Sequence, residues 1–76
     1  MHTIRLIAKN INTINEYKYL GIEYEEKALK NGVFLLYLFE KDFDTCQYDD
    51  WFLNMDIAKE VALNVYGIEK DNWEKY

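Results

Sequence analysis

The sequence predicts an α+β fold: a small antiparallel sheet of three to four strands packed by one C-terminal α-helix. Three observations carry this prediction: alternating apolar residues in the first half of the chain, the hairpin dipeptide Asn31-Gly32, and an apolar stripe at helical spacing after residue 54. The chain has 76 residues, of which 50% are hydrophobic. That is globular composition with room for one domain, which we expect to span residues 1–76.

Period-two alternation of apolar side chains predicts the strands. Residues 2–9 form the first strand, and its apolar side consists of Ile4, Leu6 and Ala8. Residues 10–15 are rich in turn formers. A second strand follows at residues 17–24, with one apolar side made of Leu20, Ile22 and Tyr24. The clearest strand is residues 33–43, and because residues 33–39 are apolar on both faces, we expect it near the middle of the sheet.

The dipeptide Asn31-Gly32 predicts how the second and third strands are connected. It accepts the positive φ angles of a two-residue type I′ turn, which would place Leu20 opposite Phe43. In that register the apolar sides of the two strands match. A second interpretation stays open: Glu23–Lys30 consists largely of good helix formers, and Asn31-Gly32 is also a suitable helix C-cap.

The last third of the chain predicts a short final strand at residues 48–53 and then a helix. Asn54 is a good N-cap, and Asp56 lies in the first turn, where its charge complements the helix dipole. Gly67 ends the helix, and Ile68 follows in a position that packs back on it. The apolar stripe consists of Ile57, Ala58, Val61, Ala62 and Val65. Residues 71–76 are expected as a polar tail whose Trp73 covers the edge of the core.

The excess negative charge is concentrated in one segment. The net charge is −5, and residues 40–56 contain six acids and one base, so the rest of the chain is balanced. Nucleic acid is not expected as a partner, because binding phosphates requires clustered Lys and Arg. Neither is a membrane, because no apolar run approaches about 20 residues. A lone Cys46 without a secretory signal predicts a cytoplasmic protein, and the bias towards Asn, Lys, Ile and Tyr is typical of many bacteria and phages.

The residue inventory argues against catalysis. There is no serine and the only histidine is His2, so a serine–histidine nucleophile cannot be built. A zinc site needs about four Cys or His ligands, and this chain has two in total, His2 and Cys46. The segment beginning at Asp42 starts like a calcium-binding loop, but its sixth position is Gln47 and its twelfth is Leu53, where such loops have Gly and Glu. We therefore expect no enzyme, no metal and no cofactor.

The segment from Glu40 to Trp51 is the best candidate for contact with a partner. Rings anchor protein interfaces and charges steer a partner of opposite sign. The residues expected to touch a basic protein partner are Asp42, Phe43, Asp44, Tyr48, Asp49, Asp50 and Trp51. The alternative for this segment is a solubilising loop whose rings point inward.

This pattern favours a small acidic protein-binding module, for example an antitoxin or immunity-like protein or a phage inhibitor. Two other functions remain open. One is a structural homo-oligomer, such as a dimer. The other is an acidic mimic of DNA that blocks a DNA-binding protein.

Overall fold

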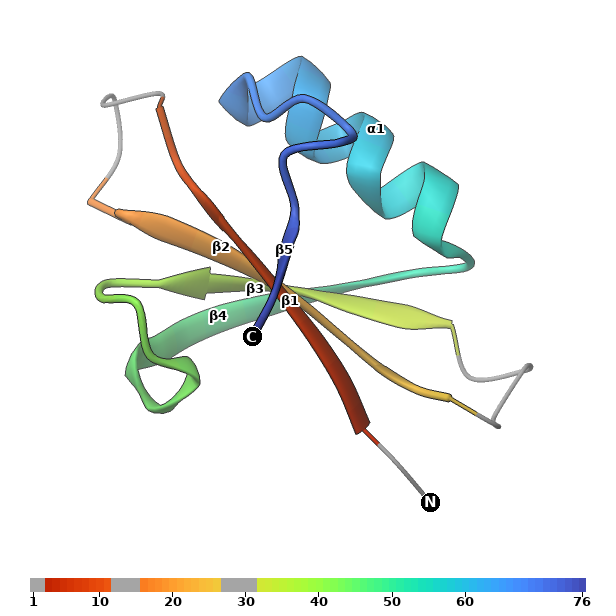
Figure 1. The fold of residues 1–76 in the computed structure, drawn as a ribbon, viewed down its shortest axis with the longest axis horizontal. Coiled ribbons are helices and arrows are strands. Elements are labelled where there is room, and N and C mark those ends of the chain that lie inside the picture. Colours follow the sequence, from red (N-terminus) through yellow and green to blue (C-terminus); the bar gives the residue numbers. More distant parts are fainter. Residues whose placement is uncertain (1–2, 12–15, 27–31) are drawn as a thin grey trace.

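A computed structural model of the protein describes residues 3–11, 16–26 and 32–76. They form a twisted five-stranded antiparallel sheet with one helix across one face (Figure 1). The strands lie in the order β4-β3-β2-β1-β5. In chain order the elements are β1 (Thr3–Lys9), β2 (Tyr19–Glu25), β3 (Val33–Leu38), the 3₁₀-helix η1 (Phe43–Thr45), β4 (Cys46–Phe52), α1 (Met55–Tyr66) and β5 (Glu74–Lys75).

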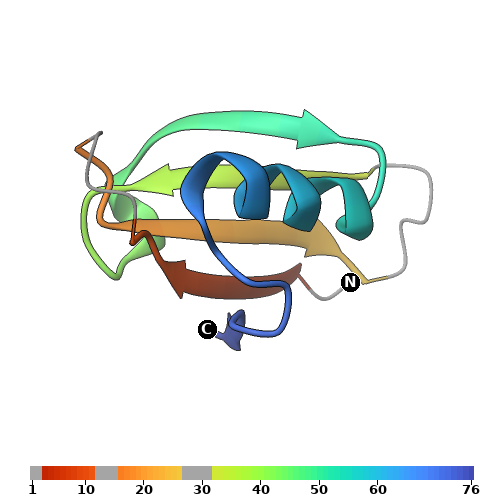
Figure 2. The ribbon, with the colours of Figure 1, turned by 90° about the horizontal axis from the view of Figure 1, so that it is seen from above.

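The first four strands form a meander, and α1 then returns the chain across the sheet so that β5 pairs with the free side of β1. The sheet therefore ends in β4 on one side and in the short β5 on the other. Figure 2 shows α1 lying over the middle strands, with its C-terminal end above the same end of the sheet where β2 and β4 begin. None of the helices in the described ranges is long and apolar enough to cross a membrane.

The face of the sheet under α1, the helix face, holds the larger core. Ala58 and Ala62 are fully buried, and their small side chains let the helix approach the strands closely. Trp73 packs against the edge of this cluster, as predicted. The buried members of the cluster are Ala8, Leu20, Ile22, Val33, Leu35, Tyr37, Ala58, Ala62 and Ile68.

The opposite face, the open face, has a smaller core that is closed by η1 (Figure 1). Phe43 is 9% exposed and packs there with Ile7, Leu36 and Leu38. It lies directly on Gly21, where an added Cβ would come within 2.6 Å of two carbon atoms of the Phe43 ring. The absence of a side chain at position 21 thus makes room for this ring. The core layers on the two faces bury Leu35–Leu38 of β3 on both sides, whereas Phe34 is 40% exposed.

The helix begins and ends as the sequence predicts. The side chain of Asn54 accepts the N–H of Ile57 at 2.9 Å, and Asp56 lies in the first turn. Gly67 has φ 72° and donates its N–H to the carbonyl oxygen of Leu63 at 3.0 Å. Ile68 packs back and is 2% exposed. The predicted stripe is too wide, because its outer members Ile57 and Val65 are 40% and 52% exposed.

The predicted register between the second and third strands is wrong. Leu20 pairs with Tyr37, six positions from Phe43, because β2 ends at Glu25 and β3 begins only at Val33. Asn31, the first of the two expected turn residues, lies outside the described residues, while Gly32, the second, has φ 65°. The shift is even, so the same apolar side chains still share a face. The observed register gives Leu20 a partner within the sheet, Tyr37. Residues 39–42, which the sequence places in the third strand, are not part of the sheet.

Two other boundaries differ from the prediction. Glu23–Glu25 belong to β2, so the helical interpretation of Glu23–Lys30 is wrong for these three residues. Glu26 is a turn, and residues 27–30 lie outside the described residues. The end of the chain forms a fifth strand rather than a polar tail, and the N–H of Tyr76 donates to the carbonyl oxygen of Arg5 at 2.9 Å. Two charged residues, Glu74 and Lys75, carry no alternation that would have indicated this strand.

Candidate functional site

β4 is an edge of the sheet and carries most of the residues expected to touch a partner. It pairs with β3 on one side, and no described strand lies along its other side. Its residues from Gln47 to Trp51 are all exposed. An edge strand presents backbone N–H and C=O groups that can pair with another chain. The outer side of β4 is therefore the part of the described sheet best placed for contact.

The pleat of β4 divides the predicted residues between the two faces, because successive side chains of a strand point to opposite sides. Tyr48 lies opposite Tyr37, a residue of the helix-face core, and Asp50 lies on the same side as Tyr48. Asp49 and Trp51 point to the open face. The predicted surface is thus two separate groups of side chains on one strand.

The remaining predicted residues lie in and beside η1. Asp42 caps this turn, because its Oδ1 accepts the N–H of Asp44 at 2.9 Å. Both carboxylates are exposed. Phe43 between them is buried on Gly21, so a partner can reach the acids of this turn but little of its ring.

On the helix face, Tyr48 and Asp50 border a hollow of about 350 Å³ that is open to solvent. We call it the tyrosine hollow. The ring centroids of Tyr17 and Tyr37 lie 5.4 Å apart, and those of Tyr17 and Tyr48 lie 6.2 Å apart with the rings nearly perpendicular. The ring of Tyr66 lies 5.7 Å from that of Tyr37. The lining residues are Tyr17, Tyr37, Tyr48, Asp49, Asp50 and Tyr66.

A hydrogen bond orients the carboxylate of Asp50, which borders the hollow. The Tyr37 hydroxyl donates to Oδ2 of Asp50 at 2.6 Å. Burial raises the pKa of Tyr37 far above its ordinary value, and hydrogen bonds to Asp50 and Tyr66 raise it further. The hydroxyl therefore remains a donor throughout the physiological pH range. A carboxylate accepts at about four sites, so Asp50 keeps acceptor capacity for a ligand.

The ring of Tyr17 is placed by a backbone network around it. The buried side chain of Asn10 donates from Nδ2 to the carbonyl oxygen of Tyr17 at 2.7 Å. The Asn10 N–H donates to the carbonyl oxygen of Lys18 at 2.9 Å, and the Lys18 N–H donates to that of Leu38 at 3.1 Å. Burial, followed by the proximity of Tyr48, raises the pKa of the Tyr17 hydroxyl. This network attaches the start of β2 to β1 and β3.

The electrostatic character of the hollow is one-sided. None of its lining residues is a lysine or an arginine. Tyr66 is the last residue of α1, and no basic residue lies in the last turn of that helix. A helix C-terminus carries partial negative charge, and aromatic faces are also negative. Asp49 borders the hollow too, although the pleat directs its carboxylate to the open face.

The open-face side of β4 presents two rings. Phe34 and Trp51 lie opposite each other on β3 and β4 and are 40% and 50% exposed. Trp51 packs on Gly32, where an added Cβ would lie 2.6 Å from the indole ring.

On the same face, burial raises the pKa of the Cys46 thiol, and the charge of Asp49 adds to the shift. This thiol is therefore poorly suited to act as a nucleophile.

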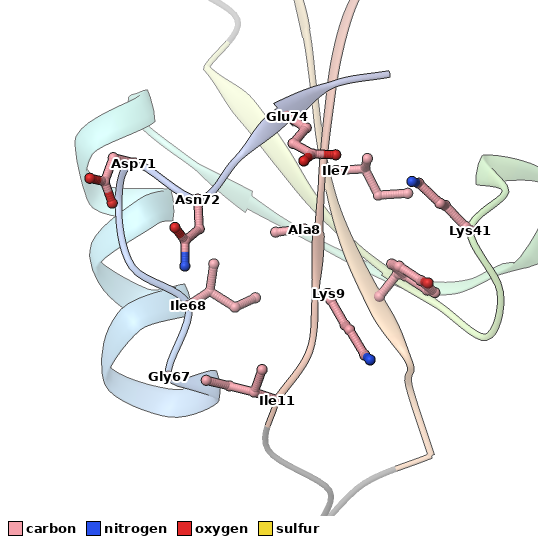
Figure 3. A pocket seen from close by; sticks show the side chains of 11 residues that line it. Ile7, Ala8, Lys9, Ile11, Lys41, Gly67, Ile68, Asp71, Asn72 and Glu74 are labelled. Carbon is pink, nitrogen blue, oxygen red and sulfur yellow. The ribbon is translucent and has the colours of Figure 1, made fainter.

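A larger hollow, of about 450 Å³, lies away from the predicted residues, beside the edge of β1 (Figure 3). Figure 3 shows Lys41 extending from its loop towards Ile7 and Glu74, while Asp71 belongs to the segment after α1. Charges of both signs border this space, so they compensate one another locally. Its lining does not favour one class of ligand, unlike that of the tyrosine hollow.

No group of three or more His, Cys, Asp and Glu in the described ranges is arranged to hold a metal ion. Comparison of the chain with protein-family models, with curated proteins and with solved structures finds no significant match. Function is therefore inferred from the chain's own side chains and their geometry.

Sequence reasoning identified Tyr48, Asp49 and Asp50 but missed the three tyrosines that complete the lining of the hollow. Tyr17, Tyr37 and Tyr66 lie on three separate segments, and no local pattern connects them. For Asn10 the sequence indicates only a turn-rich stretch, although its buried side chain donates to the backbone of Tyr17. The one available signal was the seven tyrosines of so short a chain.

Proposed function

We propose that this protein is a small acidic protein-binding domain that contacts a basic segment of another protein through β4. One observation carries the proposal: an exposed edge strand with aspartates at its centre, flanked by accessible rings on both faces. Rings of this kind provide contact area at low entropic cost. The aspartates favour a basic partner over an acidic one and speed the encounter.

Self-association through the same edge is the second candidate, because an unpaired strand of this length is a general site for sheet extension. Charge disfavours it. Asp49 is the central residue of Cys46–Phe52, so a symmetric antiparallel pairing in register would place Asp49 opposite its own copy. Like charges directly opposite each other destabilise a strand pair. A basic partner strand has the opposite effect.

Mimicry of DNA has less support. A mimic of the phosphate backbone needs its acids along one continuous surface. Here Asp42 and Asp44 lie at η1, Asp49 and Asp50 point to opposite faces, and Asp56 lies at the start of α1. Their dispersion favours a localised contact with a protein.

Affinity capture with matched charge variants tests the proposal. The full chain is immobilised as wild type, as Asp49→Asn/Asp50→Asn, and as the control Glu60→Gln/Glu69→Gln, which removes the same charge from exposed positions elsewhere. Proteins captured from lysate of the source organism are quantified by mass spectrometry at low and moderate salt. Far-UV circular dichroism verifies that each variant is folded.

We expect the wild type and the control to capture a basic protein. The amount captured should be at least fivefold lower with the β4 variant and should fall as the salt concentration rises. Equal capture by both variants would refute the proposed surface. If the bait recovers only its own chain, and light scattering shows concentration-dependent assembly, the protein is a homo-oligomer instead.

A further inference from the structure

The tyrosine hollow has a chemistry that fits one kind of side chain. We infer that it is a receptor for a single arginine of the partner's basic segment, which stacks on the exposed ring of Tyr48 and pairs with the carboxylate of Asp50. This inference rests on the proposed function and specifies what the partner inserts.

The rings provide the first half of the recognition. Tyr48 is 66% exposed, so its face is accessible, and its ring is nearly perpendicular to that of Tyr17 at 6.2 Å. Tyr37 and Tyr66 form the inner wall. A cation within about 6 Å of such rings is attracted by their quadrupoles. A side chain entering the hollow can therefore contact more than one ring.

The charge provides the second half. Asp50 is oriented by Tyr37, whose hydroxyl donates at 2.6 Å and stays protonated because its pKa is strongly raised. The described lining contains no lysine or arginine to neutralise this carboxylate. The end of α1 adds partial negative charge beside Tyr66. A cation is thus the ligand that complements the lining.

Arginine fits this geometry better than other cations. Its planar guanidinium stacks on an aromatic face while its N–H groups bind a carboxylate in the same plane. A lysine ammonium is a compact, strongly hydrated charge and gains less from an exposed ring. A quaternary ammonium ligand prefers an enclosed aromatic cage, whereas this hollow is open to solvent.

Titration of the isotopically labelled full chain, followed by NMR, tests the inference. The probes are three blocked pentapeptides, glycine throughout except for a central arginine, lysine or citrulline. Citrulline has nearly the shape of arginine but no charge. We expect the arginine peptide to shift the ring signals of Tyr17, Tyr48 and Tyr66 in a saturable manner. Its side-chain methylene signals should move upfield, because they lie over aromatic rings.

Two adjacent aspartates provide a matched control. Asp50→Asn should weaken arginine-peptide binding about fivefold or more, whereas Asp49→Asn, which removes the same charge one residue away on the open face, should change it less than about twofold. Asparagine can still accept from Tyr37, so the fold is preserved. Tyr48→Leu should abolish the upfield shift.

Several results would overturn the inference. One is equal weakening by Asp49→Asn and Asp50→Asn, which indicates general charge attraction. Another is equal affinity for the lysine or citrulline peptide, and a third is the absence of ring-signal shifts. If the peptides fail to bind while capture of a basic protein still depends on β4, this inference falls and the proposed function stands. If the arginine peptide binds but no β4-dependent partner is captured, the proposed function falls.

Discussion

Replacing Gly21 by alanine tests how η1 is attached to the sheet. A Cβ at this position would lie 2.6 Å from two ring carbons of Phe43, whereas carbon atoms in ordinary contact are about 3.5–4.0 Å apart. The ring or the strand must therefore move by about 1 Å. Overpacking of this kind costs about 1–3 kcal/mol. Alanine recovers about 0.5–1 kcal/mol, because glycine is unfavourable inside a strand.

The two ranges combine to about 0–2.5 kcal/mol, so the expected net loss for Gly21→Ala is about 1 kcal/mol in the free energy of unfolding. A chain of this length has a total stability of roughly 4–11 kcal/mol, so the loss is readily measured. Urea unfolding followed by the fluorescence of the two tryptophans measures it. With a slope of roughly 1 kcal/mol per molar urea, the midpoint falls by about 1 M.

A double-mutant cycle with Phe43→Leu isolates the steric cause. In the Gly21→Ala background the smaller leucine relieves the clash, so its cost should be lower than in the wild type by about 1 kcal/mol or more. Gly67→Ala is the control, because its new Cβ meets only ordinary contacts at 3.5 Å and its cost comes from φ 72°. It should show no coupling to Phe43→Leu. Additive energies in the first cycle would show that the Phe43 ring does not oppose a side chain at position 21.

Three further predictions concern the helix cap and two titrating groups. Asn54→Ala should destabilise the protein by about 1 kcal/mol in urea unfolding, whereas Asn54→Asp keeps the acceptor and should be nearly neutral; equal losses would contradict the cap. The pKa of Tyr37 is higher in the fold than its unfolded value of about 10, so its stabilisation is present below about pH 10 and is lost as the pH rises further. Unfolding at pH 9 and pH 11 should show a larger decline for the wild type than for Tyr37→Phe, and parallel declines would argue against this assignment. Burial and the charge of Asp49 raise the pKa of Cys46, so its thiol should react with a disulfide reagent at pH 8 more slowly than free cysteine. The reaction should become faster after Asp49→Asn. Reaction of the native wild type at the rate of free cysteine would be inconsistent with burial of the thiol.

The features that the sequence predicted correctly depend on neighbouring residues. The helix has a side-chain N-cap at Asn54, a left-handed C-cap at Gly67 and a packed Ile68, and each of these signals lies within a few positions of the structure it determines. Alternation also indicates the helix-face side of β2, and in β1 it identifies Leu6 and Ala8, although Ile7 on the other side is buried as well.

The features that could not be predicted depend on distant residues. Alternation fixes which side of β2 is buried but not which residue of β3 faces Leu20, since a shift by an even number of positions preserves the pattern. The burial of Phe43 depends on Gly21, which lies on another strand. The tyrosine hollow is lined by residues of β4 and by Tyr17, Tyr37 and Tyr66, which come from three other segments of the chain. Non-local packing of this kind leaves no signal at any single position.

The proposed contact surface for a basic partner is β4. The most direct test is to record amide NMR spectra of the labelled chain with and without the purified partner obtained by affinity capture. The largest changes are expected on Cys46–Phe52 and on two residues around the tyrosine hollow, Tyr17 and Tyr66. Unchanged β4 signals, with the changes instead clustered around the hollow beside β1 at Lys9, Ile11 and Asp71, would show that the partner binds elsewhere.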